Sequence, residues 1–206
     1  MAAFNTIEEA VADFKEGKFV LVVDSESREN EGDLIASAED MTPQKMAFLV
    51  RHSSGYICVP LSPEIADRVD LPLMVPDMQD RHKTAYTLTC DAIEGTTTGI
   101  SASDRTLTAK KLADPSSTAA TFNRPGHMVP LRGNPGGTLA RPGHTEAGLD
   151  LCKLSGKNSA AVISELVRDE DGEMARRDDC LKFAGQHNLK CITIEQIREF
   201  ILSNPQ

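Results

Sequence analysis

Residues 19–33, FVLVVDSESRENEGD, join a run of five apolar residues to a dense group of charges. The run FVLVV has the length and the branched side chains of a buried β-strand. From Asp24 to Asp33 the chain then carries five carboxylates and one arginine. Like charges repel one another, so this crowding at the end of a core strand opposes folding unless something neutralises it.

Two interpretations of this acidic segment are open. Most charged runs are solvated turns. A divalent cation, however, would make clustered carboxylates favourable, and oxygen-rich sites select magnesium, manganese or calcium. Because the segment follows the end of a strand, where ligands commonly bind, we favour a metal or ligand site. We expect Gly32 to permit a tight turn between Glu31 and Asp33.

The bulk composition is that of an ordinary globular protein. The chain has 206 residues, which suits one domain with a sizeable core or at most two small domains, and 40% of the residues are hydrophobic and 26% charged. No apolar run is long enough to predict a membrane span, and residues 1–6 lack the features of a signal peptide. The net charge of −9 argues against nucleic acid or an anionic membrane as the main partner.

The five cysteines bear on the cell compartment. Their number is odd and no Cys-x-x-Cys pair occurs, so we expect neither a disulfide framework nor a zinc knuckle. These features favour a reducing environment, and we expect the protein to be cytoplasmic.

Local patterns predict helices and short strands in mixed order. Hydrophobic spacing and capping signals predict helices over 6–16 with Gly17 at the end, from Thr42 and Pro43, from Ser103 to Leu112, and after Thr193 with Gln196 as a capping box. Apolar or alternating runs predict strands at 56–59, 84–93, 162–163 and 191–192. A doubly wound parallel sheet would alternate more regularly. We therefore expect an α+β fold, a single compact domain in which helices pack in layers on a mixed β-sheet.

A Pro- and Gly-rich stretch interrupts this pattern. Residues 123–148, NRPGHMVPLRGNPGGTLARPGHTEAG, contain four prolines and six glycines. Such a composition is typical of a passive linker, but this stretch also carries two histidines, three arginines and a glutamate. Glycines permit close approach of a ligand and prolines stiffen a loop, so we predict a functional loop.

Candidate functional side chains occur in this stretch and beyond it. Arg141 and Thr145 would give a phosphate a charged fork and a neutral donor, and a helix over 145–154 would add backbone N–H groups. His144 could complete a metal site begun by a carboxylate. Next to Gly126, His127 is either a mobile acid/base or a surface histidine. Glu165, within AAVISELV, is either a buried proton shuttle or an exposed side chain.

Together these segments resemble the 3,4-dihydroxy-2-butanone 4-phosphate synthase family of the riboflavin pathway. The resemblance covers nearly the whole chain and rests on D-x-E-x-R-E-N-E-G-D at 24–33, RHSSGYICVPL at 51–61, TTTGISASDR at 96–105, RPGHMVPLR at 124–132, RPGHTEAGLDL at 141–151 and ELVRDEDGEMAR at 165–176. Ser25 departs from the family, which often has a second aspartate there, but it lies outside the inferred ligands. The resemblance implies the single-domain form, a synthase domain over residues 1–206 without the GTP cyclohydrolase II domain.

The resemblance also implies an activity. The family's members are magnesium-dependent lyases that convert D-ribulose 5-phosphate, a phosphorylated ketose, to L-3,4-dihydroxy-2-butanone 4-phosphate and formate. We expect two Mg²⁺ or Mn²⁺ ions per site, no organic cofactor, and a homodimer whose sites lie near the subunit interface.

The implied roles of individual residues follow from the matching motifs. The implied metal ligands are Glu29 and His144; the implied substrate contacts are Arg28, Asp33, Arg141 and Thr145, the last two at the phosphate; the implied catalytic residues are His127, Glu165 and Asp33. Cys58 is expected near the site.

Two alternatives differ in function. One is another metal-dependent sugar-phosphate enzyme, an isomerase or aldolase built from the same parts. The other is a non-catalytic binding module that shares only the fold. The intact set of acidic and histidine residues argues against a mere scaffold, and release of formate would exclude an isomerase.

Overall fold

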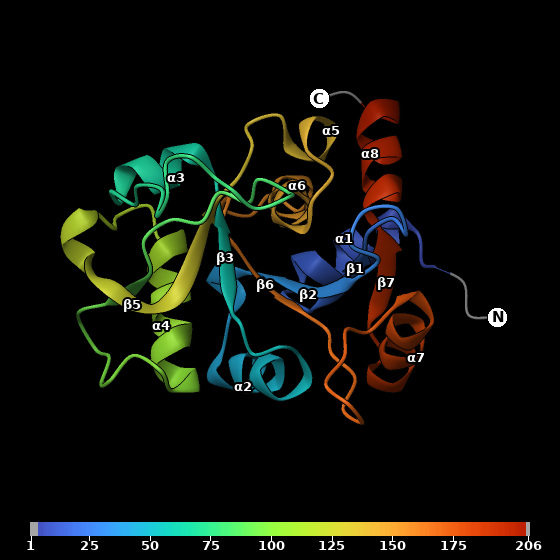
Figure 1. Ribbon diagram of the computed structural model, residues 1–206, viewed down its shortest axis with the longest axis horizontal. Helices are drawn as coiled ribbons and strands as arrows, with labels where there is room; N and C mark the ends of the chain where they lie inside the picture. Colours follow the sequence, from blue (N-terminus) through green and yellow to red (C-terminus); the bar gives the residue numbers. More distant parts are fainter. Residues whose placement is uncertain (1–3, 205–206) are drawn as a thin grey trace.

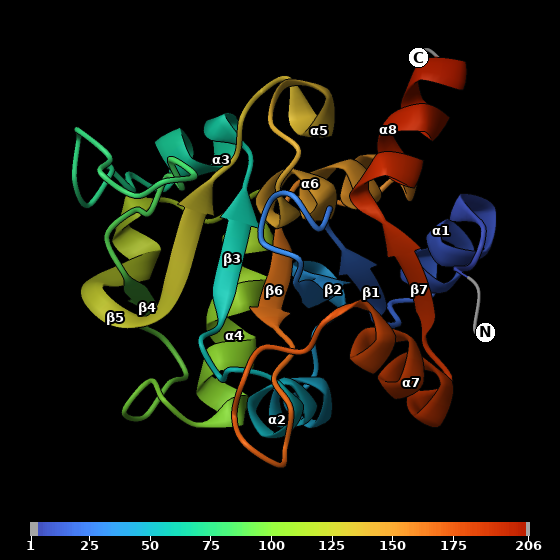
Figure 2. The ribbon, with the colours of Figure 1, turned by 45° about the vertical axis from the view of Figure 1, so that its right-hand side comes forward.

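The computed structural model describes residues 4–204, and within them seven strands form one mixed sheet in the order β4-β5-β3-β6-β2-β1-β7. The strands are β1 Val20–Val23, β2 Gly32–Ser37, β3 Cys58–Leu61, β4 Cys90–Ala92, β5 Phe122–Arg132, β6 Ala161–Glu165 and β7 Lys190–Thr193. The helices are α1 Ile7–Lys15, α2 Pro43–His52, α3 Pro63–Arg68, α4 Ala102–Ala113, α5 Gly137–Ala140, α6 His144–Leu154, α7 Arg177–His187 and α8 Ile194–Ser203, with short 3-10 turns at Ala38–Asp40 and Ala119–Thr121. Figure 2 shows β5, β3, β6, β2, β1 and β7 side by side from left to right.

Helices cover both faces of the sheet. Successive side chains of a strand point to opposite faces, so β2 directs Leu34 to one face and Ile35 to the other. Leu34 packs in a core with residues of α2, α4 and α7, whereas Ile35 packs with residues of α1, α6 and α8. Figure 1 shows α6 on one side of the sheet and α2, α4 and α7 on the other. This arrangement confirms the expected α+β fold, a single compact domain with helices layered on a mixed sheet.

Strand pairing brings distant acidic residues together. β2 is antiparallel to both β1 and β6, and its Asp33 pairs with Val22 on one side and Glu165 on the other. β1 pairs in parallel with β7, and β3 in parallel with β5. Asp33 and Ile35 alternate with Leu34, so the Asp33 and Glu165 side chains lie on the face that α6 covers.

Several predicted elements are confirmed. The first helix is capped by Thr6 in a capping box with Glu9, and the chain leaves it through Gly17 at φ +77°. Thr42 caps α2 before Pro43, and the predicted capping box of Thr193 with Gln196 begins α8. The strands predicted at 162–163 and 191–192 are parts of β6 and β7, and the one predicted at 56–59 begins two residues later as β3.

The prediction of one strand over 84–93 is wrong in its extent. Only Cys90–Ala92 form β4, and the preceding residues make isolated bridges such as Tyr86↔Leu131 and Leu73↔Thr87. Tyr86 bridges β5 and Thr87 bridges Leu73, so neither contact extends into a continuous pair of strands. The predicted cap Ser103 is also wrong. Ser101 caps α4 by accepting a hydrogen bond from the Asp104 N–H at 3.0 Å, which places Ser103 inside the helix.

The role predicted for Gly32 is wrong as well. Gly32 is the first residue of β2, and the turn before it uses Asn30, whose φ is +56°. A Cβ atom at Gly32 would lie 2.5 Å from the Cys180 sulfur of α7. The glycine is therefore required by the close packing of a helix on the strand, and not by a turn.

The Pro- and Gly-rich stretch is only partly a loop. Residues 122–132 form β5, the longest strand, and the loop prediction holds only for the segment around α5. Val129 and Leu131 are buried in the core beneath α6, and β5 pairs with both β3 and β4. Pairing and burial thus outweigh the local signals of glycine and proline.

Two predictions concern the chain's relation to membranes. In residues 4–204 no helix has the length and apolar character that crossing a bilayer requires. The predicted absence of a signal peptide concerns residues 1–6, of which residues 1–3 lie outside the described part.

Candidate active site

The acidic segment after β1 folds around one buried carboxylate. Asp24 is 6% exposed and accepts hydrogen bonds from the backbone N–H groups of Glu29 and Glu31, at 3.0 and 2.9 Å. Its Oδ2 also lies 3.1 Å from the Arg28 guanidinium. Asp24 therefore stabilises the conformation of the loop through these bonds, and the other carboxylates of the segment do not take part in them.

The start of α7 holds the same loop from outside. Arg176 donates hydrogen bonds from Nη1 to the carbonyl oxygens of Glu29 and Asn30, at 2.7 and 2.9 Å. The left-handed conformation of Asn30 turns the backbone so that both carbonyls face the arginine. Asp24 within the loop and Arg176 from α7 therefore both hold the backbone of this segment without any ligand.

His144, at the first turn of α6, faces two of the carboxylates. Its Nδ1 atom lies 3.6 Å from a Glu29 oxygen and 3.6 Å from Asp33 Oδ1. Its Nε2 atom lies 3.2 Å from the carbonyl oxygen of Val22, which can only accept. Nε2 therefore carries a hydrogen, and the neutral ring directs the Nδ1 lone pair at the carboxylates, the orientation that a metal ligand requires.

Protonation in this cluster follows from burial and charge. Burial opposes the charged form of His144, but Asp33 and Glu29 outweigh it and raise the pKa of His144 to about 9. Burial also opposes ionisation of Glu29, yet its interactions with His144 and Arg28 lower the pKa of Glu29 to about 2. The carboxylates thus favour a positive charge at His144.

Asp33 is the most confined carboxylate of the cluster. It is 2% exposed, and its Oδ1 has no hydrogen-bond partner among the described residues. Burial raises the pKa of Asp33 to about 7, with repulsion from Glu165 and Glu29 adding to the shift and His144 opposing it. An acceptor atom left unpaired at this depth is unfavourable unless a ligand or cation engages it.

Glu165 and Cys58 lie in the same part of the site as Asp33. Glu165 is half-buried beside Asp33, and its Oε2 accepts a hydrogen bond from Ser54 Oγ at 2.7 Å. Cys58 is 3% exposed, and burial together with Glu165 and Asp33 raises the pKa of its thiol. The thiol form is therefore favoured, which argues against a nucleophilic role for Cys58 in this state.

The start of α6 and Arg141 form the other end of the site. Gly143 precedes the helix without a side-chain cap, which leaves the first N–H groups of α6 available to an anion. Arg141 Nη1 lies 2.6 Å from the buried carboxylate of Glu146, and Nη2 donates to Thr84 Oγ1 at 3.1 Å. The guanidinium also donates to the His82 carbonyl, so it is held firmly beside the helix start.

The side chains of the acidic segment, His144 and Arg141 line one small cavity of about 70 Å³. It is lined by Arg28, Glu29, Glu31, Asp33, Cys58, Thr84, Tyr86, Leu131, Arg141, His144, Thr145, Ile163 and Glu165. Seven of the eight residues singled out from the sequence are therefore neighbours in the fold. Sequence reasoning missed Ser54, Thr84, Tyr86 and the carbonyl of His82, because single hydroxyls and backbone groups carry no local signal.

The eighth residue, His127, lies elsewhere. It is on β5, next to Asp91 of β4, and its side chain is 42% exposed. Because β3 and β6 stand between them, β5 lies three strand spacings from β2, which at about 4.8 Å per spacing amounts to roughly 14 Å. Within one chain the structure does not bring His127 into the cavity that holds the other seven.

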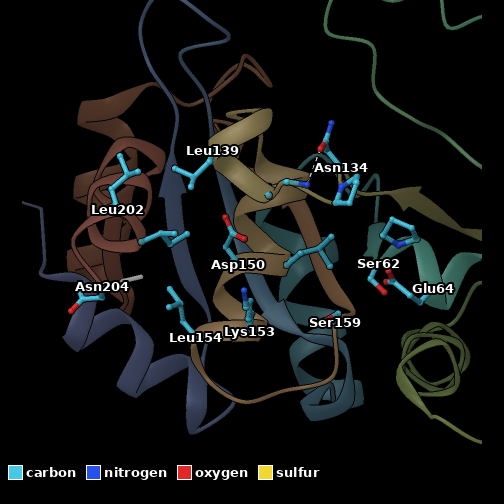
Figure 3. Close-up of a pocket in the computed structure, with 16 residues that line it drawn as sticks. Ser62, Glu64, Asn134, Leu139, Asp150, Lys153, Leu154, Ser159, Leu202 and Asn204 are labelled. Carbon is cyan, nitrogen blue, oxygen red and sulfur yellow. Dashed lines mark hydrogen bonds between the residues drawn. The ribbon is translucent and has the colours of Figure 1, made fainter. Parts of the chain in front are cut away.

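A second cavity of about 510 Å³ contains none of these residues. It lies between α5, α6 and α8, and Figure 3 shows Asp150 and Lys153 of α6 among its lining side chains. The Asp150 carboxylate is already engaged by the backbone N–H and hydroxyl of Thr138, at 2.9 and 2.6 Å. The 70 Å³ cavity lined by Glu29, Asp33 and Glu165, here called the acidic cavity, is therefore the better candidate for the active site, although it is smaller.

The acidic cavity suits a divalent cation held partly by water. No group of three or more His, Cys, Asp or Glu side chains within residues 4–204 has the arrangement of a complete metal shell. The Nδ1 atom of His144 nevertheless faces a Glu29 oxygen, and the unpaired Oδ1 of Asp33 lies 3.6 Å from the same nitrogen. Mg²⁺ usually keeps several waters and uses one or two protein carboxylates, so this donor set fits it.

Comparison with known proteins identifies the family. Residues 8–200 match the family described as 3,4-dihydroxy-2-butanone 4-phosphate synthase. The chain belongs to the 3,4-dihydroxy-2-butanone 4-phosphate synthase family. A relative named riboflavin biosynthesis protein RibBA, from Rhodococcus jostii, is 55% identical over 198 residues, which make up 48% of its length.

Similarity to members of the 3,4-dihydroxy-2-butanone 4-phosphate synthase family extends along nearly the whole chain. The protein of that name from Candida albicans is 57% identical over 198 residues, which cover 96% of this chain and 97% of the relative. The one from Saccharomyces cerevisiae is 53% identical over 205 residues. A crystal structure described as 3,4-dihydroxy-2-butanone 4-phosphate synthase in complex with two magnesium ions matches with a TM-score of 0.94 and 47% identity, and 98% of each chain is covered.

Proposed function

We propose that this protein is a magnesium-dependent lyase that converts D-ribulose 5-phosphate to L-3,4-dihydroxy-2-butanone 4-phosphate and formate in riboflavin biosynthesis. The observation that carries the proposal is the convergence of Glu29, Asp33 and His144 beside the uncapped start of α6. Family membership and the magnesium complex of a relative support it. We further propose that the synthase domain spans residues 1–206, that Mn²⁺ can replace Mg²⁺, and that the enzyme acts in the cytoplasm.

In this proposal Glu29 and His144 hold the metal. Bound divalent cations polarise the substrate carbonyl and offset the negative charge that develops on neighbouring substrate oxygens. The protein contributes a carboxylate that is ionised at neutral pH and an imidazole whose Nδ1 is directed at it. Arg28, whose guanidinium contacts Asp24 and Glu29, offsets part of the negative charge of the loop.

The phosphate of the substrate would bind at the start of α6. There the uncapped N–H groups, the Thr145 hydroxyl and Arg141 offer backbone, neutral and charged donors to one anion. Glu146 and the His82 carbonyl hold most of the Arg141 fork, so the guanidinium is oriented before the substrate arrives. A phosphate at this end directs the sugar carbons toward Asp33 and Glu165.

Proton transfers at several carbons require several acid and base groups. The pKa of Asp33, raised to about 7, allows this carboxyl to take up or release a proton near neutral pH. Glu165, oriented by Ser54 and adjacent to Asp33, is a second group within the same cavity. His127 is the third, and we infer that it reaches the site from the second subunit of a homodimer.

The direct test is formate release. The protein is incubated with ribulose 5-phosphate in the presence and absence of a chelator, and formate is measured. The proposal predicts one formate per sugar consumed, abolished by the chelator and restored by excess Mg²⁺. Consumption of the sugar without formate would indicate an isomerase or an aldolase, and binding without turnover would indicate a non-catalytic module.

A further inference from the structure

Two helices on one face of the sheet, α2 and α7, end in the same short sequence motif. α2 contains FLVRH at residues 48–52, and α7 contains FAGQH at residues 183–187. Residues four apart lie on the same side of a helix, so each helix directs a phenylalanine and, one turn later, a histidine to the same side. Both helices lie on the face of the sheet opposite to α6 (Figure 1), and none of the four residues lines the acidic cavity.

The four rings form one cluster, here called the His–Phe cluster. Phe48 and Phe183 pack against the core, and their ring centroids lie 6.2 Å apart. The His52 centroid lies 4.5 Å from that of Phe48, and the His187 centroid lies 4.2 Å from that of Phe183. The two imidazole centroids lie 5.2 Å apart, with their planes inclined by 55°. His52 is half-buried and His187 is exposed, so the imidazoles form the accessible part of the cluster.

The ring nitrogens of this cluster have no polar partner in the described part of the chain. Hydrogen bonds and ion pairs within residues 4–204 engage the rings of His82, His127 and His144, but not those of His52 and His187. Both of these histidines lie in the last turn of their helices, where the helix dipole favours a positive charge. Two adjacent imidazoles with free nitrogens at such a place are suited to a cation that prefers nitrogen ligands.

The separation of the two imidazoles matches that of ligands to one zinc ion. Zinc lies about 2.1 Å from an imidazole nitrogen and thus about 3.2 Å from the ring centroid, so at the tetrahedral angle two centroids are about 5.2 Å apart. The observed separation is 5.2 Å. Ligands at right angles, as in a square-planar copper site, would bring the centroids to about 4.5 Å. No group of three or more His, Cys, Asp or Glu side chains within residues 4–204 has a metal-binding arrangement, so water would supply the remaining ligands.

We propose that His52 and His187 bind one zinc ion, which joins the C-terminal ends of α2 and α7. Both helices adjoin segments that support the acidic cavity. α2 leads to Ser54, whose hydroxyl donates to Glu165, and α7 follows Arg176, which holds the acidic segment by its carbonyls. Zinc in the His–Phe cluster therefore stabilises the fold at a place where it takes no part in the reaction, and the proposal does not depend on the proposed function.

Titration with Zn²⁺ tests the site in solution. The tag-free protein carries Glu29→Gln, which removes a proposed metal ligand of the acidic cavity. We expect one Zn²⁺ per chain, with an affinity that falls about tenfold or more when His187→Gln is added. Gln186→Ala is the matched control, because Gln186 is an exposed neighbour on α7. Zn²⁺ should raise the melting temperature only where both histidines are present. Equal Zn²⁺ affinity with and without His187→Gln would overturn the proposal.

Anomalous diffraction at the zinc edge tests the position of the ion in the parent protein. Crystals are soaked with Zn²⁺ in the presence of excess Mg²⁺. We expect a zinc peak about 2.1 Å from a ring nitrogen of His52 and from one of His187. A peak at only one of the two rings, or none at either, would show that the His–Phe cluster is aromatic packing alone. Neither measurement uses formate release, so a negative result here leaves the proposed function intact.

Discussion

His144 Nδ1 and a Glu29 oxygen face each other across 3.6 Å, and we assign a cation to the position between them. Glu29→Gln and His144→Ala should each abolish formate release, because each removes one of the two proposed metal ligands. Isothermal titration should show at least a tenfold loss of Mg²⁺ affinity in both variants. Glu26→Gln is the control, since Glu26 is an exposed carboxylate of the same loop. Near-parent turnover in either ligand variant would refute the assignment of the metal site.

The proposed role of Arg141 at the phosphate is best tested by a conservative substitution. Removing the guanidinium would leave the Glu146 carboxylate, 1% exposed, buried without its partner, which can destabilise a fold by about 3–5 kcal/mol. Arg141→Lys retains the charge and loses the fork. We expect KM for ribulose 5-phosphate to rise roughly 10- to 100-fold with a smaller change in kcat, in line with about 1.5–3 kcal/mol for hydrogen bonds to a charged group. An unchanged KM would contradict the role of Arg141 at the phosphate.

The raised pKa of Asp33 predicts how the metal-free protein responds to pH. The folded state keeps Asp33 protonated up to about pH 7, whereas the unfolded chain ionises near 3.8, so the protonated carboxyl stabilises the fold less as the pH rises through this window. His144 acts in the same direction, because its contribution is complete below 6.5 and is lost as the pH rises through about 9. With a chelator, the melting temperature of the parent relative to Asp33→Asn should fall from pH 5 to pH 8. A relative rise would show that the carboxyl is ionised in the fold.

At the scale of elements, α7 packs on β2 through a contact that only glycine permits. Gly32→Ala places a Cβ atom against the Cys180 sulfur and should lower the free energy of unfolding by about 1–3 kcal/mol. Because the clash is with one side chain, Cys180→Ala in the same chain should recover much of that loss, as urea denaturation would show. Gly185→Ala, on the same helix with open space around it, should be neutral or stabilising. Additive effects of the Gly32 and Cys180 substitutions would contradict this account of the contact.

Some helices and strands could be predicted from the sequence, and others could not. Capping signals such as Thr6, Thr42 and Thr193 act within one turn of helix, so their helices could be predicted from local pattern. β5 and the role of Gly32 could not, because Val129 is placed by pairing with β3 and Gly32 by a helix about 150 residues later in the chain. The acidic loop was recognisable from its charges, whereas the Ser54 and Asp91 contacts depend on strands that meet only in the fold.

At the scale of the whole molecule, the distance of His127 from the acidic cavity favours an active site shared by two subunits. Exposed apolar side chains at Leu88, Ile93 and Ile100 lie in the segments next to β4, as a surface that pairs with another copy would require. Mixing two inactive variants, His127→Ala and Glu29→Gln, under conditions of subunit exchange should restore formate release, because one site of each hybrid dimer would then be intact. If each chain formed its site alone, the mixture would stay inactive, as would a mixture of Glu29→Gln with His144→Ala in our account.

In our account a divalent cation between Glu29 and His144 lets the carboxylates and a sugar phosphate share one cavity. Anomalous diffraction from crystals soaked with Mn²⁺ and ribulose 5-phosphate tests it most directly. We predict a manganese peak about 2.1 Å from a Glu29 oxygen and from His144 Nδ1, with the phosphate at the start of α6. A sugar bound with no manganese at these two side chains, or manganese bound elsewhere in the cavity, would contradict the account.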